Sequence, residues 1–178
     1  ISESKEDRNI PDQKLMRGVI QKEYAITDAY SDQPVIGTYG MGPCIALTVF
    51  DPEARVAAIA HIDGGTQVQS LDRVFYDLAG DDKSVQKRLK IGLIGGDSSS
   101  RKMAIALIKY LQERGASISF ADIIDKPYPS AFVLDSRNGD IIPEITPRDM
   151  GEEESLRMQA AGLAMNAQIR KEFDGRKN

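Results

Sequence analysis

Short apolar runs bounded by turn-forming residues dominate the pattern of hydrophobic and polar positions along the chain. Runs of this kind, rich in β-branched and aromatic residues, are typical of β-strands. The predicted strands are residues 18–27, 35–39, 44–50, 56–62, 89–94, 118–124, 131–135 and 140–145. Asp51-Pro52-Glu53 and Asn138-Gly139 are turn signals, so each predicts a hairpin between the strands that flank it. The run at 44–50 is apolar on both faces, which predicts a strand buried on both sides.

Three longer segments carry apolar residues at helical spacing. Residues 67–79 end at Gly80 and residues 98–114 end at Gly115, and glycine is a common helix stop. A last helix is predicted from 152 to about 172, opened by three acidic residues that suit its positive end. We therefore expect a single mixed α/β (α+β) layered domain over residues 18–178, in which a largely antiparallel sheet carries helices on its faces. Residues 1–17 are polar and aperiodic and predict a loose N-terminal arm.

Composition and charge narrow the class of protein. With 41% apolar residues in 178, the chain can bury an ordinary core. Its 27 acidic and 23 basic residues, without a basic cluster interleaved with aromatics, predict no nucleic-acid partner. No apolar run approaches the ~18 residues of a membrane span, and no signal-peptide pattern is present, so we expect a protein without a membrane partner.

The chain has one cysteine and one histidine. A single thiol excludes an internal disulfide, which fits a reducing, cytoplasmic compartment. One Cys and one His also fall short of a structural zinc site, so no metal or other cofactor is expected. The glycine pair Gly95-Gly96 could hold a phosphate at a helix start, but an ordinary cap by Asp97 or Ser98 is the favoured interpretation.

Cys44 and His61 lie on consecutive predicted strands joined by a tight turn. A cysteine nucleophile needs a nearby imidazole to take its proton and return it to a leaving group, so this pair is a candidate for thiol catalysis. The alternative is structural, since a lone cysteine is often a small buried apolar residue and a lone histidine a satisfied core group. Residue types alone leave both interpretations open.

Several separate segments resemble the protein N-terminal asparagine amidohydrolase family and, more distantly, the chemoreceptor glutamine deamidase CheD. Cys44 begins an apolar strand, His61 follows 17 positions later, and Thr38 lies six positions before the cysteine, as in both families. The other segments that carry the resemblance are residues 21–26, His61-Ile62-Asp63-Gly64, residues 93–96 and residues 151–157. The resemblance implies a CheD-like deamidase fold.

The resemblance also implies a reaction. Cys44 would attack a carboxamide carbon as the thiolate, ammonia would leave, and water would hydrolyse the thioester to the acid. His61 would carry the protons, and an imidazolium is one way to lower the pKa of a thiol. Thr38 would orient the imidazole; the alternative for this residue is a strand threonine bonded to backbone. Pro43 departs from both families because it has no N–H, so the oxyanion would need the N–H of Cys44, Gly42 or another residue.

The implied substrates are peptides or proteins with a free N-terminal asparagine. Their ammonium group calls for an uncompensated carboxylate in the site, and Asp63 and Glu23 are the candidates. For each of them the alternative is a turn cap or a solvated surface acid. Two other functions stay open: deamidation of internal glutamine, and a catalytically silent binding module of the same fold. The sequence does not indicate an oligomeric state.

Overall fold

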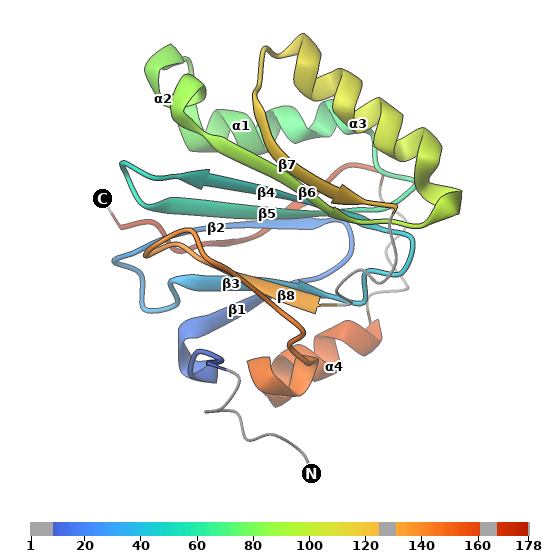
Figure 1. Cartoon of the computed structure of the whole chain (residues 1–178). Helices are drawn as coiled ribbons and strands as arrows, with labels where there is room; N and C mark the ends of the chain where they lie inside the picture. Colours follow the sequence, from blue (N-terminus) through green and yellow to red (C-terminus); the bar gives the residue numbers. More distant parts are fainter. Residues whose placement is uncertain (1–8, 125–130, 161–166, 178) are drawn as a thin grey trace.

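Two β-sheets packed face to face, with helices on the outside, make up the molecule (Figure 1). The computed structural model describes residues 9–124, 131–160 and 167–177. Helices α1, α2 and α3 lie over the outer face of the larger sheet, and α4 lies beside the smaller sheet on the opposite side of the molecule (Figure 1). The mixed α/β fold is thus confirmed, but with two sheets instead of the single sheet that we expected.

The larger sheet has six strands in the order β10-β2-β5-β4-β6-β7. Its middle is antiparallel, while the two outermost pairings, β10 with β2 and β6 with β7, are parallel. The six strands are β2 (Glu23–Asp28), β4 (Ile45–Asp51), β5 (Val56–Ile62), β6 (Lys90–Gly95), β7 (Ile118–Ile123) and β10 (Arg170–Asp174).

The smaller sheet has four strands in the order β1-β3-β8-β9. β1 runs parallel to β3, and the other two pairings are antiparallel. The strands are β1 (Met16–Val19), β3 (Val35–Tyr39), β8 (Ala131–Asp135) and β9 (Ile141–Pro143).

The helices are α1 (Asp72–Ala79), α2 (Lys83–Arg88), α3 (Arg101–Glu113) and α4 (Glu152–Ala160). Short 3₁₀ turns precede α1, α3 and α4, at Val68–Leu71, Ser98–Ser100 and Pro147–Met150, and another lies at Gln13–Leu15 before β1. Gly80 and Gly115 follow α1 and α3 with positive φ, as the helix-stop signals predicted. Asp97 caps the start of the turn before α3, which favours the structural interpretation of the glycine pair beside it. In the parts of the chain that the structure describes, no helix is both long and apolar enough to cross a membrane.

Alternation of side chains along the strands divides the core into layers. In β4, Ile45, Leu47 and Val49 pack against α1 and α3, whereas Ala46 faces the smaller sheet. The core between the sheets combines residues of both: Val19, Ala25, Ile36, Met41, Ala46, Ala57, Ile59, Ile94, Phe132 and Leu134. The strand predicted at 44–50 is therefore buried on both faces, as its sequence indicated.

Most predicted strands are confirmed within a residue or two, but the strand predicted over 18–27 is wrong. Two strands occupy this segment, β1 in the smaller sheet and β2 in the larger one, and a turn at residues 20–22 separates them. Lys22 has a φ of 62°, which breaks an extended run. The apolar residues on both sides of the turn are buried in two different sheets, so the run looks continuous in sequence although it is bent in space.

The helix predicted from 152 to about 172 is also wrong in its second half. Helix α4 covers Glu152–Ala160, and Arg170–Asp174 is the edge strand β10. Of the residues between them, 161–166 lie outside the described part of the chain. β10 is rich in charged residues, as edge strands often are, and its pairing with β2 overrides its weak helical pattern. Helix α2 has no counterpart among the predicted elements.

Candidate active site

Strand register places Cys44 and His61 on the same side of the larger sheet. Ala46 of β4 is directly opposite His61 of β5, and Cys44 lies two residues before Ala46. Cys44 precedes the first residue of β4, but its carbonyl accepts a hydrogen bond from Gly96 N at 2.8 Å, so the chain is still paired there. Residues two apart on a strand share a face, and this face is the one that packs against the smaller sheet. Cys44 and His61 are therefore diagonal neighbours between the two sheets.

Thr38 of β3 reaches His61 from the opposite sheet. The Thr38 hydroxyl is 2.7 Å from His61 Nδ1 and 2.7 Å from the carbonyl oxygen of Val19. Both interpretations of Thr38 thus apply together, since this residue contacts the imidazole and a backbone carbonyl.

This geometry determines the tautomer of the imidazole. A hydroxyl has one hydrogen, and a carbonyl oxygen can only accept, so Thr38 donates to Val19. The Thr38 oxygen must then accept from His61, which places the ring proton on Nδ1. In the neutral ring Nε2 consequently carries the free lone pair. Among the described residues Nε2 has no hydrogen-bond partner, and it is buried.

The imidazole is neutral at physiological pH. Burial lowers the pKa of His61 to about 4, against smaller opposing effects of the Asp63 charge and the Val19 carbonyl. His61 is only 1% exposed. An uncharged imidazole with its lone pair on Nε2 can act as a base.

The thiol of Cys44 is uncharged as well. Burial, followed by the negative charge of Asp63, raises its pKa to about 11. Cys44 is 5% exposed. The structure therefore holds a neutral thiol and a neutral imidazole, not the thiolate and imidazolium that the sequence resemblance suggested as one possibility.

The segment before Cys44 is a tight turn. Gly40 and Gly42 have positive φ, and Cys44 N donates to the Met41 carbonyl at 2.6 Å. The Cys44 N–H, which we expected to donate to an oxyanion, therefore already donates within this turn. The carbonyl of Pro43 accepts from the Ser100 hydroxyl at 2.5 Å, which ties the turn to the start of α3.

Asp63 follows β5 and is partly enclosed by its neighbours. It accepts from Gln21 Nε2 at 2.6 Å and from the Thr66 hydroxyl at 2.9 Å, and Lys22 Nζ lies 3.6 Å away. Burial raises the pKa of Asp63, but the hydrogen bonds from Gln21 and Thr66 and the charge of Lys22 outweigh it and the net shift is downward. Asp63 is thus ionised, but it is not the uncompensated carboxylate that we expected.

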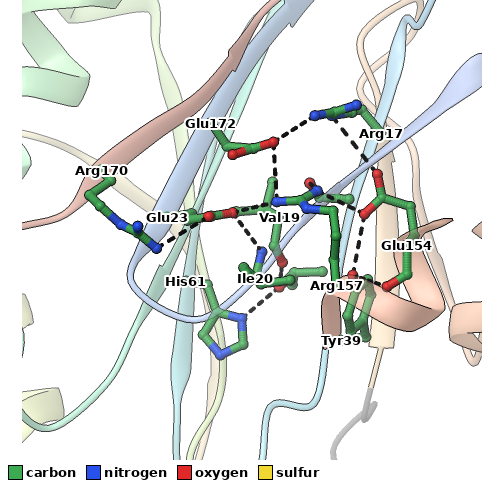
Figure 2. A network of polar contacts seen from close by, with 12 residues as sticks. Arg17, Val19, Ile20, Glu23, Tyr39, His61, Glu154, Arg157, Arg170 and Glu172 are labelled. Atoms are coloured by element: carbon green, nitrogen blue, oxygen red, sulfur yellow. Dashed lines mark hydrogen bonds and ion pairs between the residues drawn. The ribbon is translucent and has the colours of Figure 1, made fainter. Parts of the chain in front are cut away.

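Glu23, at the start of β2, is likewise compensated. Its Oε2 lies 2.8 Å from Arg157 of α4, and its Oε1 lies 3.4 Å from Arg170 of β10 (Figure 2). Burial and the neighbouring Glu172 raise the pKa of Glu23, and the two arginines oppose this shift. The structure therefore brings Cys44, His61 and Thr38 together and places Glu23 in a separate ion-pair network, on the far side of the Val19–Ile20 turn from His61.

A cavity of about 500 Å³ lies at the same end of the larger sheet. Its volume is within the range of small-ligand sites. Pro43, next to Cys44, and Gly64, next to Asp63, both line it. The remaining lining residues come from the loop after β5, the 3₁₀ turn before α3 and the first half of α3: Thr66, Ser99, Ser100, Lys102, Met103 and Ala106.

Two groups near the imidazole were not predicted from the sequence: the Arg157 side chain, which binds Glu23, and the Val19 carbonyl, which accepts from Thr38. Arg157 belongs to a segment that carried the family resemblance, but nothing in the sequence showed that it would reach Glu23. The Val19 carbonyl left no signal, because a main-chain group is present whatever the side chain.

Cys44, the candidate nucleophile, and an imidazole whose Nδ1–H is bonded to Thr38 thus lie on one face between the two sheets. The described residues contain no group of three or more His, Cys, Asp or Glu side chains that could hold a metal ion. The family model of protein N-terminal asparagine amidohydrolase matches residues 6–124, more than half of the chain. The chain belongs to this family. Family membership identifies it as a hydrolase of the amidohydrolase, or deamidase, type.

Two relatives are similar to parts of the chain. An uncharacterized protein of Rickettsia conorii is 26% identical over 137 residues, which cover 68% of this chain and 78% of that protein. A probable chemoreceptor glutamine deamidase, CheD 2 of Geobacter metallireducens, is 45% identical over 31 residues, which cover 17% of this chain and 19% of that protein. The second similarity is therefore local.

Proposed function

We propose that the protein is a cysteine-dependent amidohydrolase that converts the N-terminal asparagine of peptides or proteins to aspartate and releases ammonia. The family supports the reaction type. The observation that carries the proposal is the hydrogen bond of His61 Nδ1 to Thr38, while Nε2 has no hydrogen-bond partner in the described parts of the chain and the ring lies on the face where Cys44 lies.

The first half of the proposed reaction forms a thioester. His61 Nε2 takes the thiol proton as the sulfur of Cys44 attacks the side-chain amide carbon. Because thiol and imidazole are both neutral before the reaction, this proton moves during the attack, not before it. The tetrahedral intermediate collapses when the C–N bond breaks and the nitrogen takes the proton back from the imidazolium, so that ammonia leaves.

The second half regenerates the enzyme. His61 Nε2 accepts a proton from a water molecule whose oxygen attacks the thioester carbon. The C–S bond then breaks, the thiolate of Cys44 recovers the proton from the imidazolium, and the aspartate product is released. Thr38 accepts from Nδ1–H throughout, so the ring need not rotate between the two halves.

Asp63 is our candidate for the group that binds the substrate ammonium. It is ionised and adjoins Gly64, which lines the cavity beside the Cys44 turn. Lys22 neutralises part of its charge and Gln21 donates a hydrogen bond to it, so the ammonium would compete with both for the carboxylate. The cavity would take the residues that follow the asparagine.

Ammonia release from four short peptides tests the proposal: one with a free N-terminal Asn, the same peptide acetylated, one beginning with Gln and one with an internal Gln. We expect turnover of the first peptide and its loss on acetylation. Turnover of internal Gln would instead support a glutamine deamidase, which the local similarity to CheD 2 makes the second candidate. No release from any of the four peptides would support the silent binding module.

Cys44→Ser tests the nucleophile. The two side chains are close in size, so the folded state should persist while turnover falls to background; thermal unfolding of both proteins provides the control. Retained turnover in the serine variant would contradict the assignment.

A further inference from the structure

The peptide group between Val19 and Ile20 is held at both of its ends. Its C=O accepts from the Thr38 hydroxyl at 2.7 Å, and its N–H donates to Glu23 Oε2 at 3.3 Å. The two contacts fix the plane of one peptide unit, since C=O and N–H point in opposite directions from it. Glu23 therefore contacts one side of this rigid peptide group, and His61 is linked to the opposite side through Thr38 (Figure 2).

Glu23 is itself fixed by charge. Arg157 Nη2 lies 2.8 Å from Oε2, and Arg170 Nη2 lies 3.4 Å from Oε1. Glu23 is 5% exposed, and a charged carboxylate in such a place needs its charge compensated. Burial raises the pKa of Glu23, and the two arginines oppose this rise, so they favour the charged form that accepts the Ile20 N–H.

Arg157 also holds the preceding peptide. Its Nη1 donates to the Gly18 carbonyl at 3.1 Å and to Glu154 Oε2 at 2.9 Å. Glu23 N closes the turn by donating to the Ile20 carbonyl at 3.1 Å. The carbonyls of residues 18, 19 and 20 are each occupied by a separate donor, so the turn has little freedom to rotate the Val19 carbonyl away from Thr38.

We infer that Glu23, held by Arg157 and Arg170, is a positioning residue: it orients the Val19–Ile20 peptide, and through the Thr38 hydroxyl it keeps the proton of His61 on Nδ1. This inference deepens the proposed function, on which its kinetic part rests. Without an oriented Val19 carbonyl, the Thr38 hydroxyl can turn its hydrogen toward Nδ1. The ring would then hold its proton on Nε2, where it cannot accept one from a thiol.

Glu23 is thereby given a different role from binding the substrate ammonium. Its two carboxylate oxygens already have the Ile20 N–H and two guanidinium groups as partners. An ammonium would have to displace an arginine to reach it. Polarisation along the chain of hydrogen bonds from Glu23 to His61 also supports the positioning role. A negative charge at the N–H of a peptide strengthens its C=O as a hydrogen-bond acceptor.

The chain has a single histidine, so the tautomer can be read directly. In protein labelled with ¹⁵N-histidine, the protonated and unprotonated ring nitrogens of His61 give two well-separated signals. We expect the unaltered protein at pH 7 to carry its proton on Nδ1. In Glu23→Gln, which preserves the size of the side chain but removes its charge, the two signals should move toward each other as both tautomers become populated. A proton on Nε2 in the unaltered protein, or signals unchanged in Glu23→Gln, would overturn the inference.

Kinetics provide the second readout. In Glu23→Gln we expect kcat for the N-terminal Asn peptide to fall by about 10- to 100-fold while KM changes little, because the base is misplaced and the substrate site is not. A rise in KM for the free peptide alone, at constant kcat, would mean that Glu23 reads the ammonium and would overturn the positioning role.

Asp51→Asn is the matched control. Asp51 is another buried carboxylate held by an arginine, with Arg88 Nε at 2.8 Å, and it lies at the opposite end of β4 from Cys44. We expect this variant to lose stability without a change in the ¹⁵N signals or in kcat. If Asp51→Asn moves the signals as much as Glu23→Gln does, the effect is one of general destabilisation and the inference fails.

Two further outcomes are separable. If Glu23→Gln does not fold, Arg170→Gln serves in its place, since Arg170 is 49% exposed and its loss should move the signals in the same direction by a smaller amount. If no peptide is hydrolysed but the ¹⁵N signals respond as described, the positioning role of Glu23 is supported and the proposed function alone is wrong.

Discussion

Cys44 and His61 are both uncharged at neutral pH, because burial raises the pKa of the thiol and lowers that of the imidazole. In the proposed reaction, a neutral thiol beside a neutral imidazole means that charges separate only when the substrate is attacked. Being uncharged also protects the protein's single thiol from oxidation and alkylation, since only the thiolate reacts readily.

The reactivity of Cys44 with iodoacetamide should therefore depend steeply on pH. With a pKa near 11, the thiolate fraction and the alkylation rate should rise about tenfold per pH unit between pH 7 and pH 9. The rate is measured by mass spectrometry, and the control is the same protein unfolded in guanidinium chloride, whose rate should level off near the ordinary thiol pKa of about 8.5. A fast rate that is already constant below pH 7 would indicate a preformed thiolate–imidazolium pair and contradict this account.

At the residue scale, the sequence predicted which side chains would form the candidate site. Cys44, His61 and Thr38 were singled out by spacing and family resemblance, and the structure brings these three residues together. The contact of the Val19 carbonyl with Thr38 and the partners of Glu23 could not be predicted from the sequence. Contacts between residues 134 and 147 positions apart in the chain depend on where α4 and β10 fold, which local pattern does not specify.

At the scale of elements, β1 and α4 approach so closely that Gly18 is required. A Cβ added at Gly18 would lie 2.2 Å from Glu154 Oε2 and 3.2 Å from the Tyr39 ring. Glu154 cannot move away freely, because Arg157 binds the same oxygen at 2.9 Å and the Tyr39 hydroxyl is 3.3 Å from it. The glycine thus permits α4 to place Arg157 against the turn after β1.

Gly18→Ala should accordingly lower the free energy of unfolding by about 1–3 kcal/mol, as overpacking of a fixed site does. Urea unfolding measures this change. Gly64→Ala is the control, because a Cβ there meets nothing within 4 Å, and its stability should stay close to that of the unaltered protein. Equal stability of the two variants would show that α4 does not pack against Gly18 as described.

Elements with strong local signals were predicted and those fixed by distant partners were not. The hairpin of β4 and β5 has a turn and two apolar strands in one continuous segment, and both strands were predicted closely. β10 is short and charged, and only its pairing with β2 makes it a strand. The break between β1 and β2 was missed because the apolar residues on both sides of the turn at Lys22 are buried, so the two strands look like one continuous run in the sequence.

The number of sheets is a property of the whole molecule. Strand propensity predicts that segments are extended but not which neighbours they pair with, and β3 pairs with β1 on one side and on the other with β8, from a distant part of the chain. Two sheets instead of one place His61 in the layer between them, where Thr38 can reach it from the opposite side. The site thus depends on a level of organisation that the sequence did not predict.

Burial of His61 between the sheets should make global stability sensitive to mild acid. The unfolded state protonates His61 near its ordinary pKa of 6.5 and the folded state only near 4. Because the folded pKa is the lower one, the stability is fully present above pH 6.5 and is lost as the pH falls toward 4. This one group should cost roughly 2–3 kcal/mol of unfolding free energy between pH 7.5 and pH 4.5.

The comparison protein is His61→Gln, which has no titrating ring at this position. Urea unfolding of both proteins across this pH range isolates the contribution of the imidazole, since the carboxylates titrate in both and cancel. The unaltered protein should lose more stability on acidification than the variant. Parallel curves for the two proteins would contradict a buried neutral histidine.

The peptide unit between Val19 and Ile20 links Glu23 to Thr38 through a backbone N–H and a backbone C=O. Every amino acid except proline has both of these groups. The side chains at these two positions can therefore vary with packing alone, and a comparison of residue types would not reveal that a functional group lies there. Proline at position 20 is the exception, because it abolishes the donor while leaving the acceptor in place. Part of what orients the imidazole is thus a main-chain group, whose position depends on the backbone conformation and not on the residue types at these two positions.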